Sequence, residues 1–234
     1  MGRHGRETRR EFVSGVGRIA AGVTLGTSVT ASSVSALEHQ SAGNAIGAAE
    51  WDMSWVERVN VATDRAVFDW PTLGSPGDSI VLQIAARYLD NCAAAYGDQK
   101  YDARAVLNIR TQAVPAALSD AMWERFSLGT EFSTNDPHTT QPAVRNPFLY
   151  HAPELAPGIV SPSLADLFGR GSLALVCDFA LGHLARRLAA KAKRQQSEVH
   201  AELKDGLVSG SYLVPSGIFG LTKAQNVGCA YVRM

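Results

Sequence analysis

A buried strand that runs directly into a helix, at residues 173–185, constrains the fold of this chain more than any other stretch. Four apolar residues in a row, at 173–176, are typical of a strand that is covered on both faces. Leucines at 181, 184 and 188 then follow helical spacing. Cys177 and Asp178 stand at the junction, which in a parallel sheet lies at the carboxyl edge, where such folds bind ligands. Because a helix amino terminus carries partial positive charge and stabilises a thiolate, Cys177 is the first candidate for a catalytic residue.

The rest of the chain repeats this alternation of strand and helix. Apolar runs predict further strands at 65–70, 103–109, 212–215 and 230–233, the last short enough to be an edge strand. Helical spacing predicts helices at 79–97, 115–126, 163–168, 178–196, 197–208 and 216–227. This alternation favours an α/β fold of three layers, in which a mostly parallel five-stranded sheet carries helices on both faces.

Residues 127–162 interrupt the alternation. They contain six prolines and show no clear period. Such a segment is too long for an ordinary connection, so we interpret it as a functional loop, a partner-binding surface or a covering flap. The expected organisation is therefore a signal or anchor at 1–36, a linker and lead-in at 37–60, and a domain at 61–234 that contains this Pro-rich insertion.

The amino-terminal residues resemble a twin-arginine export signal. The sequence TRREFV at 8–13 places Arg9, Arg10 and Phe12 in the Ser/Thr-Arg-Arg-x-Phe pattern, a weakly apolar stretch follows, and VSA at 34–36 resembles a cleavage site. Residues 12–36 are long enough to span a bilayer, although Arg18 makes them a poor permanent span. The signal is thus either removed or kept as an anchor that contacts the membrane. The resemblance implies a location in the periplasm or on the outer face of the cytoplasmic membrane.

The charge and cysteine patterns argue against several classes of function. Lys plus Arg and Asp plus Glu both number 22, and no long basic run occurs, so nucleic acid is not expected as a partner. The three cysteines show no spacing typical of a zinc site, and the glycines form no phosphate-binding loop, so neither a metal nor another cofactor is expected. Cys92 and Cys229 are interpreted as small core residues.

Other polar residues are expected at the same edge of the sheet as Cys177. Asn108 and Arg110 end the predicted second strand and are able to donate to an anionic ligand, with Asp178 as a third candidate for ligand binding. A role in capping the local loop explains the first two equally well. His183 follows Cys177 by six residues and would point to a different helix face, so the spacing does not support a Cys–His pair.

The order of short motifs resembles the DsrE/DsrF-like family, and more closely an exported branch of it with twin-arginine signals and no assigned role. The matching segments cover about 65–232 and are RAVFD at 65–69, ARYL at 86–89, LSDAMW at 118–123 with LG at 128–129, RNP at 145–147, Gly171 through Val176-Cys177 with AL at 180–181, LVPS at 213–216, and Ala224-Gln225 through Gly228 to Tyr231.

Two functions follow from this resemblance. In sulfur-relay members the acceptor cysteine follows a strand and begins a helix, so the resemblance implies a persulfide role for Cys177; an enzyme of this kind would be sulfurtransferase-like. The alternative is a non-catalytic accessory or structural subunit of a membrane-associated complex, which uses the domain as a scaffold. Partners would then be further copies of the chain, in keeping with the family, or the subunits of that complex.

Overall fold

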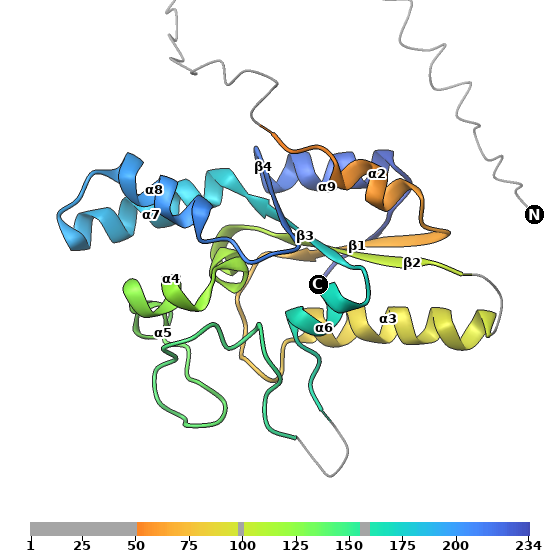
Figure 1. Cartoon of the computed structure of the whole chain (residues 1–234), viewed down its shortest axis with the longest axis horizontal. Coiled ribbons are helices and arrows are strands. Elements are labelled where there is room, and N and C mark those ends of the chain that lie inside the picture. The colour runs from red at the N-terminus through yellow and green to blue at the C-terminus, as the bar shows by residue number, and fades with distance from the viewer. Residues whose placement is uncertain (1–50, 98–100, 155–159) are drawn as a thin grey trace, which may run out of the picture. The chain divides into compact units, whose positions relative to one another are not determined.

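A five-stranded, all-parallel sheet forms the centre of the domain (Figure 1). The computed structural model describes residues 51–97, 101–154 and 160–234, so the expected signal or anchor at 1–36 lies outside the described residues. The strands are β1 (Asp64–Trp70), β2 (Ala103–Ile109), β3 (Leu173–Cys177), β4 (Ser211–Val214) and β5 (Ala230–Val232), in the order β4-β3-β2-β1-β5. The predicted five-stranded α/β fold is confirmed, and β5 is an edge strand as expected.

Helices cover both faces of the sheet, which gives the three predicted layers (Figure 1). Four helices pack in one cluster with one face: α3 (Ile80–Tyr96), α6 (Leu164–Gly169), α7 (Asp178–Ala192) and α8 (Gln196–Asp205). On the other face α2 (Trp55–Asn60) and α9 (Gly217–Asn226) form a second cluster. Each connection from β1 to β2, β2 to β3 and β3 to β4 leads to the neighbouring strand on the same side. The connection from β4 to β5 runs in the opposite direction, back across the sheet to the far side of β1. Because such crossovers are right-handed, the reversal places α9 opposite the other crossover helices.

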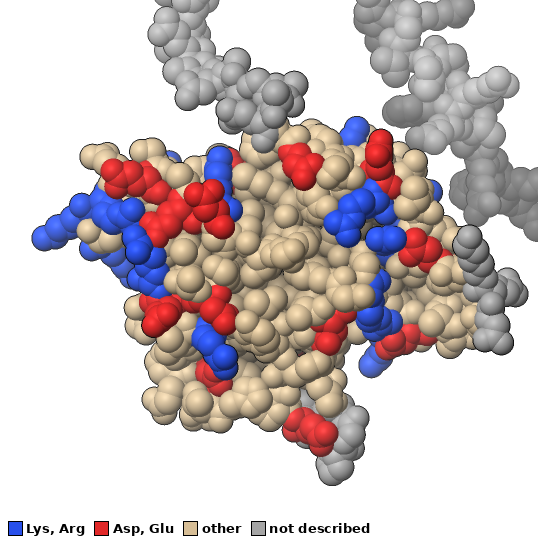
Figure 2. All heavy atoms as spheres, viewed as in Figure 1, with Lys and Arg blue, Asp and Glu red and all other residues tan. Residues whose placement is uncertain are grey.

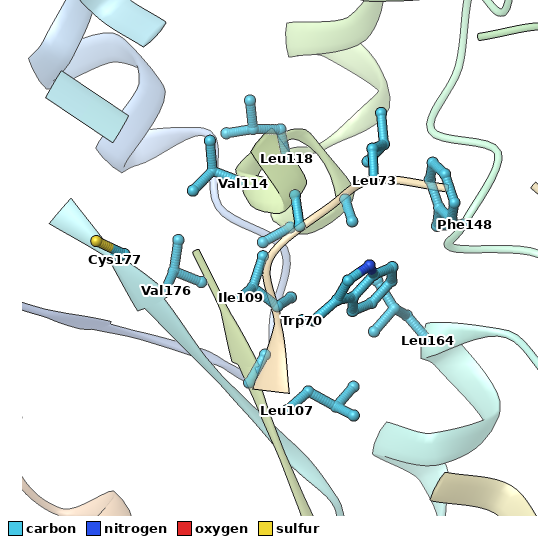
Figure 3. Packing of buried hydrophobic residues seen from close by; sticks show 14 of the residues in the cluster. Trp70, Leu73, Leu107, Ile109, Val114, Leu118, Phe148, Leu164, Val176 and Cys177 are labelled. Atoms are coloured by element: carbon cyan, nitrogen blue, oxygen red, sulfur yellow. The ribbon is translucent and has the colours of Figure 1, made fainter. Parts of the chain in front are cut away.

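Side chains of the central strands alternate between these two clusters. In β3, Ala174 and Val176 join the cluster beneath α7, while Leu173 and Leu175 join the cluster beneath α9. All five residues of β3 are buried, as expected for a strand covered on both faces. Figure 3 shows part of the larger cluster, which includes Trp70 and, at one side of the labelled group, Phe148. Each fully buried side chain of this size stabilises the fold by about 1.5–3 kcal/mol.

The predicted helix at 115–126 is wrong in its extent. A 3₁₀ helix, η3 (Thr111–Ala117), contains Pro115 and ends at Leu118, whose extended backbone pairs with Leu207. A separate helix, α4 (Asp120–Arg125), begins after Ser119. The indole Nε1 of Trp123 donates to the Pro115 carbonyl at 2.9 Å. The apolar residues that suggested one helix therefore lie on two short elements, folded against each other by this buried bond.

The described part of the Pro-rich insertion packs into the core. It begins with a single helical turn, α5 (Leu128–Glu131), and continues as irregular chain. The Phe148 ring lies 5.8 Å from that of Trp70, centroid to centroid, and is almost fully buried. Asn146, also buried, donates its Nδ2 to the carbonyls of Ala116 and Leu118 at 2.8 and 2.6 Å. The irregular part of this segment is thus attached to the domain by side-chain hydrogen bonds and by the packing of Phe148.

Charged residues gather at the end of the domain formed by α7 and α8, where Lys and Arg lie beside Asp and Glu (Figure 2). Arg194 Nη1 contacts Glu202 Oε2 at 2.7 Å, and Lys191 pairs with Glu131. Two of the three cations at 191–194, Lys191 and Arg194, are therefore ion-paired. Within the described residues, none of the helices combines the length and apolar character that crossing a membrane requires.

Candidate functional site

At the carboxyl edge of the sheet, the connections that follow the neighbouring strands β3 and β4 lead to opposite faces of the sheet. After Cys177 the chain enters α7 on one face, whereas after Val214 it enters α9 on the other. Cys177 and Val214 are partners in the sheet. Open α/β sheets bind ligands at such switch points, because the diverging connections leave a crevice. The thiol therefore occupies the position at which this topology favours a ligand.

Cys177 is the amino-terminal cap of α7. Its Sγ accepts a hydrogen bond from the Ala180 amide at 3.3 Å, and the residue is 5% exposed. An extended backbone at Cys177 turns the side chain back over the first helical turn, as at a Ser or Asp cap. The start of α7 and the Ala180 amide thus both direct partial positive charge at the sulfur.

A buried carboxylate, Asp69, organises the same edge at the ends of β1 and β2. Arg110 donates from Nε to Oδ1 and from Nη2 to Oδ2, each at 2.7 Å. Asn108, the partner of Asp69 in the sheet, adds a bond from Nδ2 at 3.2 Å, and Tyr231 donates its hydroxyl at 3.3 Å. Burial alone would raise the pKa of Asp69, but the bonds from Arg110, Asn108 and Tyr231 together hold it below its ordinary value.

Arg110 connects the carboxylate to the neighbourhood of the thiol. Its hydrogen bonds to Asp69 raise the pKa of the guanidinium, and the nearby Cys177 adds a smaller effect in the same direction. The side chain lies against the start of α9, where a Cβ on Gly217 would be only 2.7 Å from Arg110 Cβ. Two predicted site residues, Arg110 and Cys177, thus directly follow Ile109 and Val176, which are partners in the adjacent strands β2 and β3, and a glycine makes room for Arg110.

The structure places the other predicted site residues differently. Asn108 is fully buried beneath the edge, so it supports Asp69 instead of facing a ligand. Asp178 faces α8, where it accepts from His200 Nε2 at 2.8 Å and lies 3.5 Å from Lys204 Nζ. The signal residues Arg9, Arg10 and Phe12 lie outside the described residues.

Sequence reasoning missed Asp69 and Tyr231 as members of this site. A detectable signal existed for Asp69, because a carboxylate stands inside an apolar run that predicts a buried strand, and a buried charge needs a partner. His183 is exposed and packs edge-on against Phe179, with ring centroids 4.7 Å apart. Among the described residues, no cluster of three His, Cys, Asp or Glu side chains is arranged to hold a metal.

Apolar side chains are exposed around this edge. Phe179, in the first turn of α7, is 68% exposed, while Ile218 and Phe219, in the first turn of α9, are 74% and 38% exposed. The side chain of Ser216 caps α9 by accepting from the Phe219 amide at 3.2 Å. Both helices that begin at the β3–β4 edge of the sheet therefore present apolar groups to the solvent.

The fold and this site define an α/β protein with a nearly buried thiol at the switch point of its sheet, close to an arginine–aspartate pair. No family model matches the chain, and no curated protein matches it. Among solved structures, the chain is similar to a protein of unknown function, MTH1491, from Methanobacterium thermoautotrophicum. That match has 15% identity and a TM-score of 0.36, and covers 73% of this chain and 99% of the other.

Proposed function

We propose that this protein is an exported, DsrE-like protein that accepts sulfane sulfur on Cys177 and holds it as a persulfide. The observation that carries the proposal is the place of Cys177, whose thiol caps α7 at the switch point of a parallel sheet. The resemblance of the motifs at 65–232 to sulfur-relay proteins supports the same residue. The amino-terminal TRREFV motif supports a role outside the cytoplasm.

The transfer needs a nucleophile and a leaving group but no change in overall oxidation state. The Cys177 thiolate attacks the outer sulfur of a donor persulfide, R–S–S⁻, and forms the new S–S bond. The donor's S–S bond breaks, and its electron pair leaves with the inner sulfur as R–S⁻. The transferred sulfur remains on the protein as Cys–S–S⁻.

The surroundings of Cys177 suit the anionic product. The persulfide anion would remain close to the amino terminus of α7 and to the positively charged Arg110, whose orientation Asp69 fixes through two hydrogen bonds. We assign Arg110 a role in binding the anionic donor and Asp69 a role in positioning Arg110.

Intact-mass measurement tests the proposal directly. The purified protein is treated with glutathione persulfide, and a gain of one sulfur is expected, mapped to Cys177 by peptide analysis. Cys177→Ser is expected to fold normally, because serine is a good helix cap, and to show no such gain. Cys92→Ser is the matched control and is expected to gain sulfur like the parent protein. No sulfur on Cys177, with the fold intact, overturns the proposal.

A second candidate function is that of an accessory subunit in a membrane-associated complex. The exposed side chains of Phe179, Ile218 and Phe219 favour it, since apolar groups concentrated on one edge are typical of an interface. Purification from native membranes separates the two functions. Co-migration with a large complex, unchanged by Cys177→Ser, supports the accessory subunit, whereas a free protein that carries sulfur on Cys177 supports the sulfur acceptor.

A further inference from the structure

A pocket of about 420 Å³ lies between η3 and the first three turns of α7, next to the candidate site. Its buried lining residues are Val114, Ala180 and Leu184, each at most 8% exposed. Two aromatic residues, Phe132 and Phe179, form its sides. The volume lies within the range typical of small-molecule sites, and this combination of a buried apolar floor and aromatic sides suits an organic group.

The rim of this pocket is positively charged. Arg187 lines it, with the guanidinium carbon 4.7 Å from the centre of the Phe132 ring. Arg187 Nε contacts Glu131 Oε1 at 2.8 Å, and Lys191 shares the same carboxylate. Because two cations face one carboxylate, positive charge remains in excess. An anion with an apolar body therefore matches both the rim and the floor.

The pocket is joined to the candidate site through a single residue. Ala180 contributes to the floor, and its amide donates to Cys177 Sγ at 3.3 Å. Val114 and Cys177 belong to the same core cluster and lie at one side of the labelled group in Figure 3. A ligand that fills the pocket thus lies against Ala180, whose amide donates to the thiol.

We propose that this pocket binds the organic part of an anionic sulfane-sulfur donor, and that the donor's R group is aromatic or otherwise apolar. Arenethiosulfonates, Ar–SO₂–S⁻, have this chemistry. The transfer step rests on the function proposed above for Cys177. Small inorganic donors such as thiosulfate lack the apolar group that the floor and the two phenylalanines would contact.

The reaction with such a donor balances without an added oxidant or reductant. The Cys177 thiolate attacks the terminal sulfur of Ar–SO₂–S⁻ and forms Cys–S–S⁻. The S–S bond of the donor breaks, and its electron pair leaves on the sulfinate, Ar–SO₂⁻. Two negative charges enter the step and two remain.

The test compares benzenethiosulfonate with methanethiosulfonate as donors to the purified protein. Persulfide formation on Cys177 is followed by mass, and each rate is divided by the donor's rate with free cysteine, which removes differences in intrinsic reactivity. The aromatic donor is expected to react about tenfold faster after this correction, because its ring is buried in the pocket. Equal corrected rates overturn the inference.

Three variants, at two exposed phenylalanines, locate the effect. Phe179→Ala is expected to remove most of the preference for the aromatic donor, and Phe179→Leu to restore part of it. Phe219→Ala is the control, because Phe219 is also exposed but lies on α9, outside the pocket lining. A preference that survives Phe179→Ala, or that disappears equally in Phe219→Ala, contradicts the proposed site.

Binding of benzenesulfinate to the Cys177→Ser protein separates this inference from the proposed function. The sulfinate has the ring and charge of the donor but no sulfur to transfer, and calorimetry is expected to show binding that Phe179→Ala weakens. Sulfinate binding without persulfide on the parent protein ends the sulfur-acceptor function but leaves the pocket assignment. Persulfide from both donors without sulfinate binding ends the pocket assignment alone.

Discussion

At the scale of single residues, the fold depends on the neutralisation of Asp69 by its partners. The residue is 3% exposed and receives two bonds from Arg110. Asp69→Asn removes the charge that Arg110 faces and turns one acceptor into a donor. We expect a loss of about 2–3 kcal/mol in the free energy of unfolding, measured by urea denaturation at neutral pH. Asp90→Asn, which breaks the exposed pair with Arg170, is expected to cost less than about 0.5 kcal/mol.

The same carboxylate makes part of the stability depend on pH. Because the pKa of Asp69 is lower in the folded than in the unfolded chain, its stabilisation is complete above the unfolded value of about 4 and is lost as the pH falls through the folded value. The difference in unfolding free energy between the parent protein and Asp69→Asn should therefore shrink in acid. A difference that stays constant from pH 7 down to pH 3 contradicts this assignment.

At the scale of elements, two helical glycines look alike in sequence but differ in their surroundings. In α9, a Cβ on Gly220 would lie 2.8 Å from Asn108 Oδ1 and 3.3 Å from a methyl group of Val214. In α7, a Cβ on Gly182 would meet nothing closer than 3.7 Å.

Gly220→Ala is therefore expected to lower the unfolding free energy by about 1–3 kcal/mol, although alanine has a better helix propensity than glycine. Gly182→Ala is expected to raise it by about 0.5–1 kcal/mol. Thermal melts of both variants decide this, and equal effects exclude the close approach of α9 to Asn108.

The Pro-rich insertion depends on one side chain for its attachment. Asn146→Ala leaves the carbonyls of Ala116 and Leu118, and the Phe148 amide, without their side-chain partner. We expect a loss of about 2–4 kcal/mol in unfolding free energy, because these groups stay buried. Limited proteolysis is expected to cut within 127–162 sooner than in the parent protein. Asn135→Ala, at an exposed position in the same segment, should change neither measurement.

Elements whose pattern is local were predictable from sequence, and those fixed by distant partners were not. The strands were found because buried apolar runs mark them directly, as at 173–177. The helix expected at 115–126 failed because its end is set by the pairing of Leu118 with Leu207 and by the bond from Trp123 to Pro115. Both contacts join residues that one helical period does not relate.

In the candidate site, too, the features set by local sequence were predictable and those set by distant partners were not. The junction of β3 and α7 placed Cys177 correctly at the carboxyl edge, because the strand–helix order alone determines that position. The direction of each polar side chain depends on the register between strands and on neighbouring helices. Asp69 meets Arg110 because β1 and β2 end together, and Asp178 turns to His200 because α8 packs beside α7. Neither fact is present in the local sequence.

At the scale of the whole molecule, charge is divided unevenly along the chain. Residues 1–36 contain five arginines and two glutamates, whereas the remaining residues contain 17 basic and 20 acidic side chains. The proposed export signal thus has the positively charged amino-terminal region that such signals require. A route that carries folded proteins would also deliver Cys177 already in place as the cap of α7.

If the proposed export takes place, the location of the whole protein depends on the pair Arg9 and Arg10. Arg9→Lys with Arg10→Lys keeps the charge of the leader but removes the guanidinium pair, and we expect the protein to remain in the cytoplasm of a twin-arginine-competent host. Cell fractionation with immunoblotting measures this. Arg3→Lys with Arg6→Lys makes the same chemical change outside the motif and should leave export unaffected. Intact mass of the exported form then separates the two fates of the leader: a chain that begins near Leu37 shows cleavage, and a full-length chain in the membrane fraction shows a retained anchor. Export that survives the paired change at 9 and 10, or that both double variants reduce equally, excludes a twin-arginine signal in this chain.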